Sequence, residues 1–200
     1  LAARRSLYVA VPAVAYVGGV MAHAVSPVLF WRLLAYAAVI HFVRQQYGWV
    51  ALYRRKNGEG PEGRRLDAWT IYAATIVPLV YWHAHLPRRF HWFLAGDFVP
   101  GLPSWVGSAA LAAFPPLLVA FLVKEARRRV KGQPVSTGKI LIVLSTALTW
   151  FLGIVILDSD YAFTVTNVLV HGIPYVGLVL ATSRARAAQH AAQGQAPTLA

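Results

Sequence analysis

Apolar stretches of roughly 20 residues recur along the chain, and each is long enough to cross the ~30 Å hydrocarbon core of a bilayer as a helix. The 200 residues are 58% hydrophobic and 13% charged, whereas charged residues make up about a quarter of an ordinary soluble domain. The sequence therefore predicts an all-α integral membrane bundle. It contains no cysteine, which excludes disulfides, thiolate metal sites and thiol catalysis.

Turn-forming stretches divide the apolar runs into about six predicted transmembrane helices. Residues 1–182 are expected to form a single transmembrane domain, and residues 183–200 a polar, disordered cytoplasmic tail. The six predicted helices are Leu7–Ala24, Leu33–Tyr53, Ala68–Leu86, Ser104–Val123, Ile140–Leu157 and Ala162–Thr182.

The net charge of +12 is compatible with nucleic-acid binding, but the distribution of the charge argues against it. Lys and Arg gather in short segments between the apolar runs, as they do in the cytoplasmic loops of membrane proteins. With six crossings, this pattern places both termini in the cytoplasm and predicts a bacterial inner (plasma) membrane protein. Membrane lipid is then an expected partner, and nucleic acid is not. The basic segments are Arg4–Arg5, Arg54–Arg65, Lys124–Lys131 and Arg184–Arg186.

Polar residues lie in the middle of the second predicted helix. Arg32 and Arg54 are 22 residues apart, which is ~33 Å of helix, so they are expected to mark its two borders. Between them, His41, Arg44, Gln45 and Gly48 follow helical spacing and share one face. An arginine at that depth costs at least ~2.5 kcal/mol unless it is paired or wetted. This face is therefore predicted to point into the bundle, with Gly48 allowing another helix to approach.

A matching stripe occurs in the sixth predicted helix, where Asn167, His171 and Tyr175 are spaced by four residues. His171 lies near the middle of its span, at the same expected depth as His41. Ionisable groups inside membrane segments are more often functional than structural. The two imidazoles are therefore predicted to meet near the middle of the bilayer.

Further candidate ligands lie near the outward border of the membrane. His83 and His85 are two residues apart, so they would converge only if their helix unwinds before Pro87. Asp158 lies at the same border of the membrane and is a weaker candidate. His23 and His91 also fall on this side, where imidazole and aromatic rings are ordinary in the headgroup layer.

The leading functional hypothesis is a metal-dependent oxidoreductase that uses non-haem iron as an oxygenase, hydroxylase or desaturase. Its substrate would be a lipid, an isoprenoid or another apolar small molecule, and a redox partner is a further possibility. Arg44, Gln45, Asn167 and Tyr175 would orient the ligands, set the local charge or supply a proton. The expected metal ligands are His41, His83, His85, His171 and Asp158.

Two alternatives remain open. In the first, the chain is a redox protein in which His41 and His171 bind a b-type haem from its two faces. In the second, it is a transporter or proton pathway, which the absence of an evident membrane-buried acid weakens. A retinal photoreceptor is set aside, because the candidate lysine, Lys139, is expected at the inner border of its helix.

Overall fold

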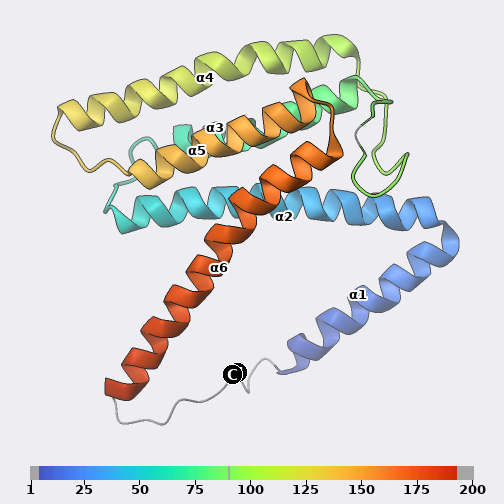
Figure 1. Ribbon diagram of the computed structural model, residues 1–200, viewed down its shortest axis with the longest axis horizontal. Coiled ribbons are helices and arrows are strands. Elements are labelled where there is room, and N and C mark those ends of the chain that lie inside the picture. Colours follow the sequence, from blue (N-terminus) through green and yellow to red (C-terminus); the bar gives the residue numbers. More distant parts are fainter. Residues whose placement is uncertain (1–4, 90, 193–200) are drawn as a thin grey trace.

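The computed structural model describes residues 5–89 and 91–192, and the regular elements within these ranges are all helices. This confirms the predicted all-α class. In chain order the helices are α1 (Arg5–Val25), α2 (Pro27–Lys56), α3 (Arg64–Ala84), α4 (Ser104–Val130), α5 (Thr137–Trp150), the π-helix η2 (Phe151–Ile156) and α6 (Asp160–Ala192) (Figure 1).

A single residue, Ser26, separates α1 from α2. Its hydroxyl accepts a hydrogen bond from the backbone N–H of Leu29 at 3.3 Å, and Pro27 occupies the first turn of α2. Serine before proline is a strong signal for the start of a helix. The second helix therefore begins at Pro27, earlier than the predicted Leu33.

Two helices continue by seven residues or more past their predicted ends. α4 extends to Val130 through three arginines, which are favourable at the negative end of a helix dipole. α6 extends to Ala192. The prediction of a disordered tail is therefore wrong for residues 183–192, and the rest of that tail lies outside the described residues.

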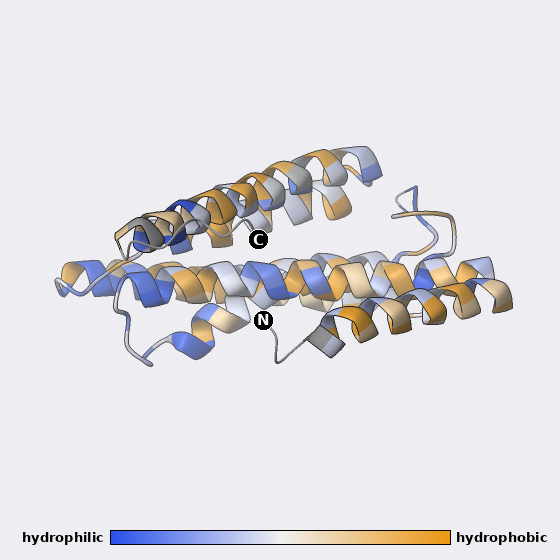
Figure 2. Ribbon diagram, turned by 90° about the horizontal axis from the view of Figure 1, so that it is seen from below, coloured by the Kyte–Doolittle hydropathy of each residue, from blue (hydrophilic) through white to orange (hydrophobic). Residues whose placement is uncertain are grey.

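Within the described ranges, five helices are long and apolar enough to cross a bilayer: α1, α2, α4, α5 together with η2, and α6. Figure 2 shows hydrophobic residues along most of the length of the helices. α3 has a similar length, but its first turn carries Arg64, Arg65 and Asp67. The sixth crossing and the cytoplasmic position of both termini stay predictions.

α3 lies in the middle of the bundle, where it packs against α2, α4, α5 and η2. Large aromatic side chains fill the contact between these helices, and Trp82, Trp150 and Phe163 are almost completely buried. Gly153 in η2 allows α6 to approach closely. A Cβ atom at this position would lie 2.8 Å from the Cα of Phe163, so only glycine fits without a shift.

The connection between α3 and α4 folds back onto α2. The Asp97 carboxylate accepts the backbone N–H groups of Trp92 and Phe93 at 2.9 and 2.7 Å, which fixes a tight turn. The Trp92 ring then stacks on Phe42 of α2, with 5.6 Å between the ring centroids. α1 and the second half of α6 diverge from the bundle (Figure 1).

Candidate functional site

His41 of α2 and His171 of α6 lie side by side. Figure 1 shows these two helices crossing. The centroids of the two histidine rings are 5.8 Å apart, and the rings are steeply inclined to one another. The Phe42 ring contacts His171 as well, with 4.4 Å between the centroids. Phe42 is itself held by Trp92, so an aromatic pair supports the histidines from the α3–α4 connection. The predicted meeting of residues 41 and 171 is confirmed at the level of ring proximity.

The two histidines lie at the edge of the bundle, because His41 is exposed and His171 is half-buried. Arg44 and Gly48 are exposed too, and a Cβ atom at Gly48 would meet nothing within 4 Å. The prediction that this face of α2 points into the bundle is therefore wrong. The inward face of α2 instead carries Ala35, Val43, Gln46 and Val50.

Asn167 is the deepest polar residue of the α6 stripe, with 3% of its surface exposed. One turn before it, Phe163 packs against Trp150, and one turn after it, His171 packs against Phe42. Asn167 therefore faces the interior, as predicted. Neither its Oδ1 nor its Nδ2 has a hydrogen-bond partner among the described residues. A buried amide without partners costs about 1–3 kcal/mol.

The remaining polar residues of the prediction are less central. Gln45 is half-buried, and its Nε2 is buried without a partner in the described part of the chain. Arg44 donates a long hydrogen bond of 3.5 Å to the hydroxyl of Tyr72. Tyr175 is 55% exposed and lies outside the buried part of the α6 stripe.

His83 is engaged elsewhere. Its Nδ1 lies 2.7 Å from the carbonyl of Leu79, which can only accept, so this nitrogen carries the proton. Its Nε2 then accepts from the hydroxyl of Tyr36 at 2.9 Å, and that hydroxyl accepts the N–H of Val99 at 3.1 Å. Both ring nitrogens are occupied within the protein. The predicted role of His83 as a metal ligand therefore conflicts with the geometry.

His85 and Asp158 do not join the two central histidines either. His85 donates through Nδ1 to the carbonyl of Tyr81 at 2.7 Å, and its ring lies against Gly107 of α4. α3 remains helical to Ala84, so His83 and His85 keep different directions. The Asp158 carboxylate pairs with the guanidinium of Arg88 at 3.0 Å and accepts the N–H of Arg89 at 3.3 Å. It therefore anchors the α3–α4 connection.

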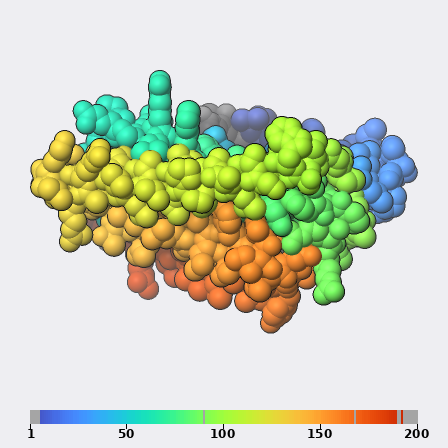
Figure 3. All heavy atoms as spheres, turned by 90° about the horizontal axis from the view of Figure 1, so that it is seen from above, coloured from blue at the N-terminus to red at the C-terminus, as the bar shows by residue number. Residues whose placement is uncertain are grey.

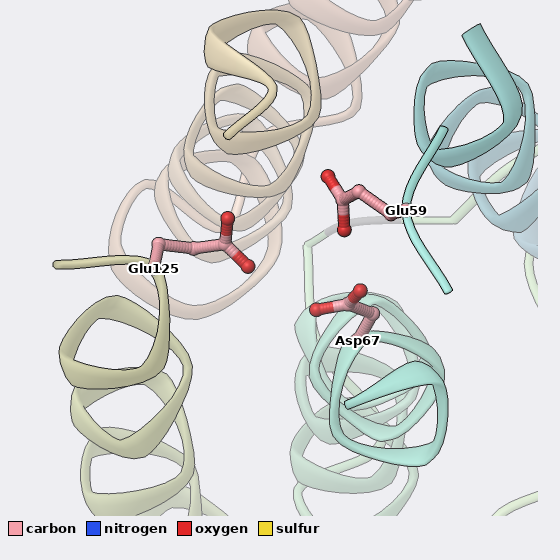
Figure 4. A group of neighbouring side chains, drawn as sticks. All are labelled: Glu59, Asp67 and Glu125. Atoms are coloured by element: carbon pink, nitrogen blue, oxygen red, sulfur yellow. The ribbon is translucent and has the colours of Figure 1, made fainter. Parts of the chain in front are cut away.

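A second polar group, which the sequence analysis missed, lies at the end of the bundle where α2 and α4 finish. Figure 4 shows the carboxylates of Glu59, Asp67 and Glu125 pointing toward one another. The ammonium of Lys139 lies 2.6 Å from Glu59, 2.8 Å from Glu125 and 3.3 Å from Asp67. Lys139 has no exposed surface. We call these four residues, with the two cations described next, the charge cluster.

Arg54 and Lys124 complete the charge cluster. Arg54 pairs with both Glu59 and Asp67, and Lys124 pairs with both Asp67 and Glu125. The cluster thus contains three carboxylates and three cations, and its formal charge is zero. The carboxylates lie close enough together to hold a metal ion, but the Lys139 ammonium occupies the position between them. Each of these carboxylates is paired with cations, so none of them is the free buried acid that the alternative of a proton pathway needs.

One signal in the sequence points to this cluster. Lys139 lies in the first turn of α5, where the helix dipole disfavours a positive charge, and an apolar run follows it directly. A cation at such a position needs acidic partners.

No family model matches the chain, and neither the curated proteins nor the solved structures contain a match.

Proposed function

We propose that the chain is a membrane-embedded, metal-dependent oxidoreductase whose iron is held by His41 and His171. The observation that carries the proposal is the approach of these two rings from different helices, with 5.8 Å between their centroids. A metal lies about 2.0–2.1 Å from an imidazole nitrogen and so about 3 Å from the ring centre. Two rings on one metal are then about 5–6 Å apart, which agrees with the observed separation.

The groups around the pair fit a metal. The Nδ1 atom of His171 is buried and has no hydrogen-bond partner in the described structure, so a ring nitrogen is available. Imidazole nitrogens suit iron, copper and zinc, and iron with open positions supplies dioxygen activation. The Asn167 amide would orient a ligand or a substrate oxygen, because its own oxygen and nitrogen are unused. Arg44, held by Tyr72, would balance negative charge near the pair.

The surroundings of the pair favour an apolar substrate. His41 is exposed, and the neighbouring Ile40 and Ile173 are 63% and 64% exposed. In a bilayer, these side chains would face the acyl chains. A lipid or isoprenoid would then reach the histidines laterally, without passing through water. Membrane insertion itself is supported by the five apolar helices.

A b-type haem is the second candidate cofactor for the same pair. Its support is that two imidazoles converge while His83, His85 and Asp158 are engaged elsewhere. A six-coordinate haem needs two axial histidines and no carboxylate, whereas non-haem oxygenases normally use a third protein ligand.

Elemental analysis and absorption spectra of the detergent-purified chain test the proposal. We expect about one iron per chain, with a Soret band for haem and little colour for non-haem iron. His41→Ala and His171→Ala should each remove most of the iron. His23→Ala is the matched control, since His23 is an exposed histidine on α1 that packs against Phe30. Full iron occupancy in the double variant His41→Ala/His171→Ala would overturn the assignment.

A further inference from the structure

A basic hollow lies where the end of α4 meets the start of α3. Figure 3 shows these two segments side by side, the end of α4 in yellow and the start of α3 in teal. The hollow has a volume of about 420 Å³. Its lining combines apolar side chains, including Leu66 and Val123, with four cations: Lys124, Arg127, Arg128 and Lys131.

Three of these cations have no acidic partner in the described structure. The chain has seven acidic residues, and four of them lie at this end: Glu59, Glu62, Asp67 and Glu125. Three of these belong to the charge cluster, and the Glu62 carboxylate forms no ion pair with the cations of the hollow among the described residues. No ion pair among the described residues involves Arg127, Arg128 or Lys131. Arg128 donates to the carbonyl of Pro134 at 3.0 and 3.3 Å, which fixes the guanidinium without neutralising it. The hollow therefore concentrates uncompensated positive charge.

The two kinds of lining residue are separated along the helix axis. Val123, which is 41% exposed, comes one turn before Arg127 and two turns before Lys131. The apolar part thus lies toward the middle of the bundle and the cations lie at its end. A phospholipid has the same order, with acyl chains toward the bilayer centre and the phosphate at the border. Basic pockets of this kind between membrane helices suit anionic head groups.

We propose that this hollow binds the phosphate of an anionic phospholipid. Arg127, Arg128 and Lys131 contact the phosphate, and one acyl chain lies along Leu66 and Val123. The guanidinium of Arg128 is held in place through Nε and Nη2 by the Pro134 carbonyl, and its Nη1 is the atom that contacts a phosphate oxygen. The site is independent of His41 and His171, which lie on α2 and α6.

Native mass spectrometry of the detergent-purified full chain tests the site, with phosphatidylglycerol and phosphatidylcholine of the same acyl chains as probes. We expect retained phosphatidylglycerol and little phosphatidylcholine. Arg127→Gln/Lys131→Gln should weaken phosphatidylglycerol binding by roughly 10-fold or more, since each surface cation contributes on the order of 1 kcal/mol. Both side chains are exposed, so the variant should fold. Arg184→Gln/Arg186→Gln removes the same charge from α6 and should change binding less than about two-fold.

Three results would overturn the site. Equal retention of both lipids would show that the phosphate charge is not recognised. An equal loss of phosphatidylglycerol binding in the two double variants would show that only the total charge of the chain matters, and not this hollow. Full displacement of the lipid by millimolar inorganic phosphate would show that the apolar lining contributes nothing. Iron content should be unchanged in both variants, which separates this site from the proposed metal centre.

Discussion

Lys139 of α5 is buried against Glu125 of α4, with 2.8 Å between the ammonium nitrogen and the carboxylate. Through Glu59 and Asp67, the same ammonium also joins the α2–α3 connection to the first turn of α3. Four segments of the chain are thus held together at one end of the bundle by a charge-balanced group.

Removing the central cation should destabilise the bundle strongly. Lys139→Met leaves three buried carboxylates with two cations, and an uncompensated buried charge costs about 3–5 kcal/mol. The free energy of unfolding in detergent, followed by circular dichroism, measures the loss. The double variant Lys139→Met/Glu125→Gln restores neutrality and should recover most of the stability. A double variant that is no more stable than Lys139→Met would contradict the electrostatic explanation.

Tyr36 and His83 provide a test of the structural role given to His83. Tyr36→Phe removes the donor to His83 Nε2 and the acceptor of the Val99 N–H. We expect a loss of about 1 kcal/mol in the free energy of unfolding, because the half-buried His83 ring and the exposed Val99 N–H each lose a hydrogen bond. The iron content of the purified protein should not change. If substitution of His83 itself removed iron from the purified protein, His83 would again be a candidate ligand.

A variant of Asn167 should affect the stability of the protein and its binding of iron in opposite directions. Asn167→Leu replaces a buried amide that has no partner, so the metal-free protein should become more stable, by about 1 kcal/mol or more. If the amide orients a ligand, the same variant should bind iron or substrate more weakly. Thermal unfolding of the metal-free protein and iron titration give the two readouts. A variant that is less stable and binds iron normally would mean that Asn167 has a structural partner.

Gly153 positions α6 against η2. Gly153→Ala would bring a Cβ atom to 2.8 Å from the Cα of Phe163 and push α6 away. We expect a destabilisation of about 1–3 kcal/mol, as for other overpacked contacts. Because Phe163 lies on α6 two turns before His171, iron binding should weaken too. Gly177→Ala in α6 is the control. A Cβ atom there meets nothing within 4 Å, so stability should stay equal or rise by up to ~1 kcal/mol.

The helices and the proximity of His41 and His171 could be predicted from the sequence. Apolar runs of membrane length define helices by themselves, and the equal depth of His41 and His171 followed from their position in their runs. The orientation of α2 was not predictable in the same way. Apolar side chains occur on all sides of this helix, so the spacing of His41 and Arg44 could not show which face turns inward.

The charge cluster was missed for a different reason. Its contacts join residues that are far apart in the chain, as for Glu59 and Lys139, which are separated by 80 positions. In the sequence, Arg54 and Lys124 are indistinguishable from the neighbouring cations, which were all interpreted as signals of membrane orientation. Their pairing depends on how four helix ends meet, which the local pattern does not contain.

The neutrality of the charge cluster also bears on the order in which the chain is made. Synthesis delivers Arg54, the three carboxylates and Lys124 before Lys139, because α5 follows all of them. Until that last ammonium emerges, the charge cluster contains three carboxylates and only two cations, and this imbalance favours keeping the cluster in contact with water. Closure of the bundle at this end therefore waits for α5, so a nascent chain halted before residue 139 should remain open there and be cut readily by proteases.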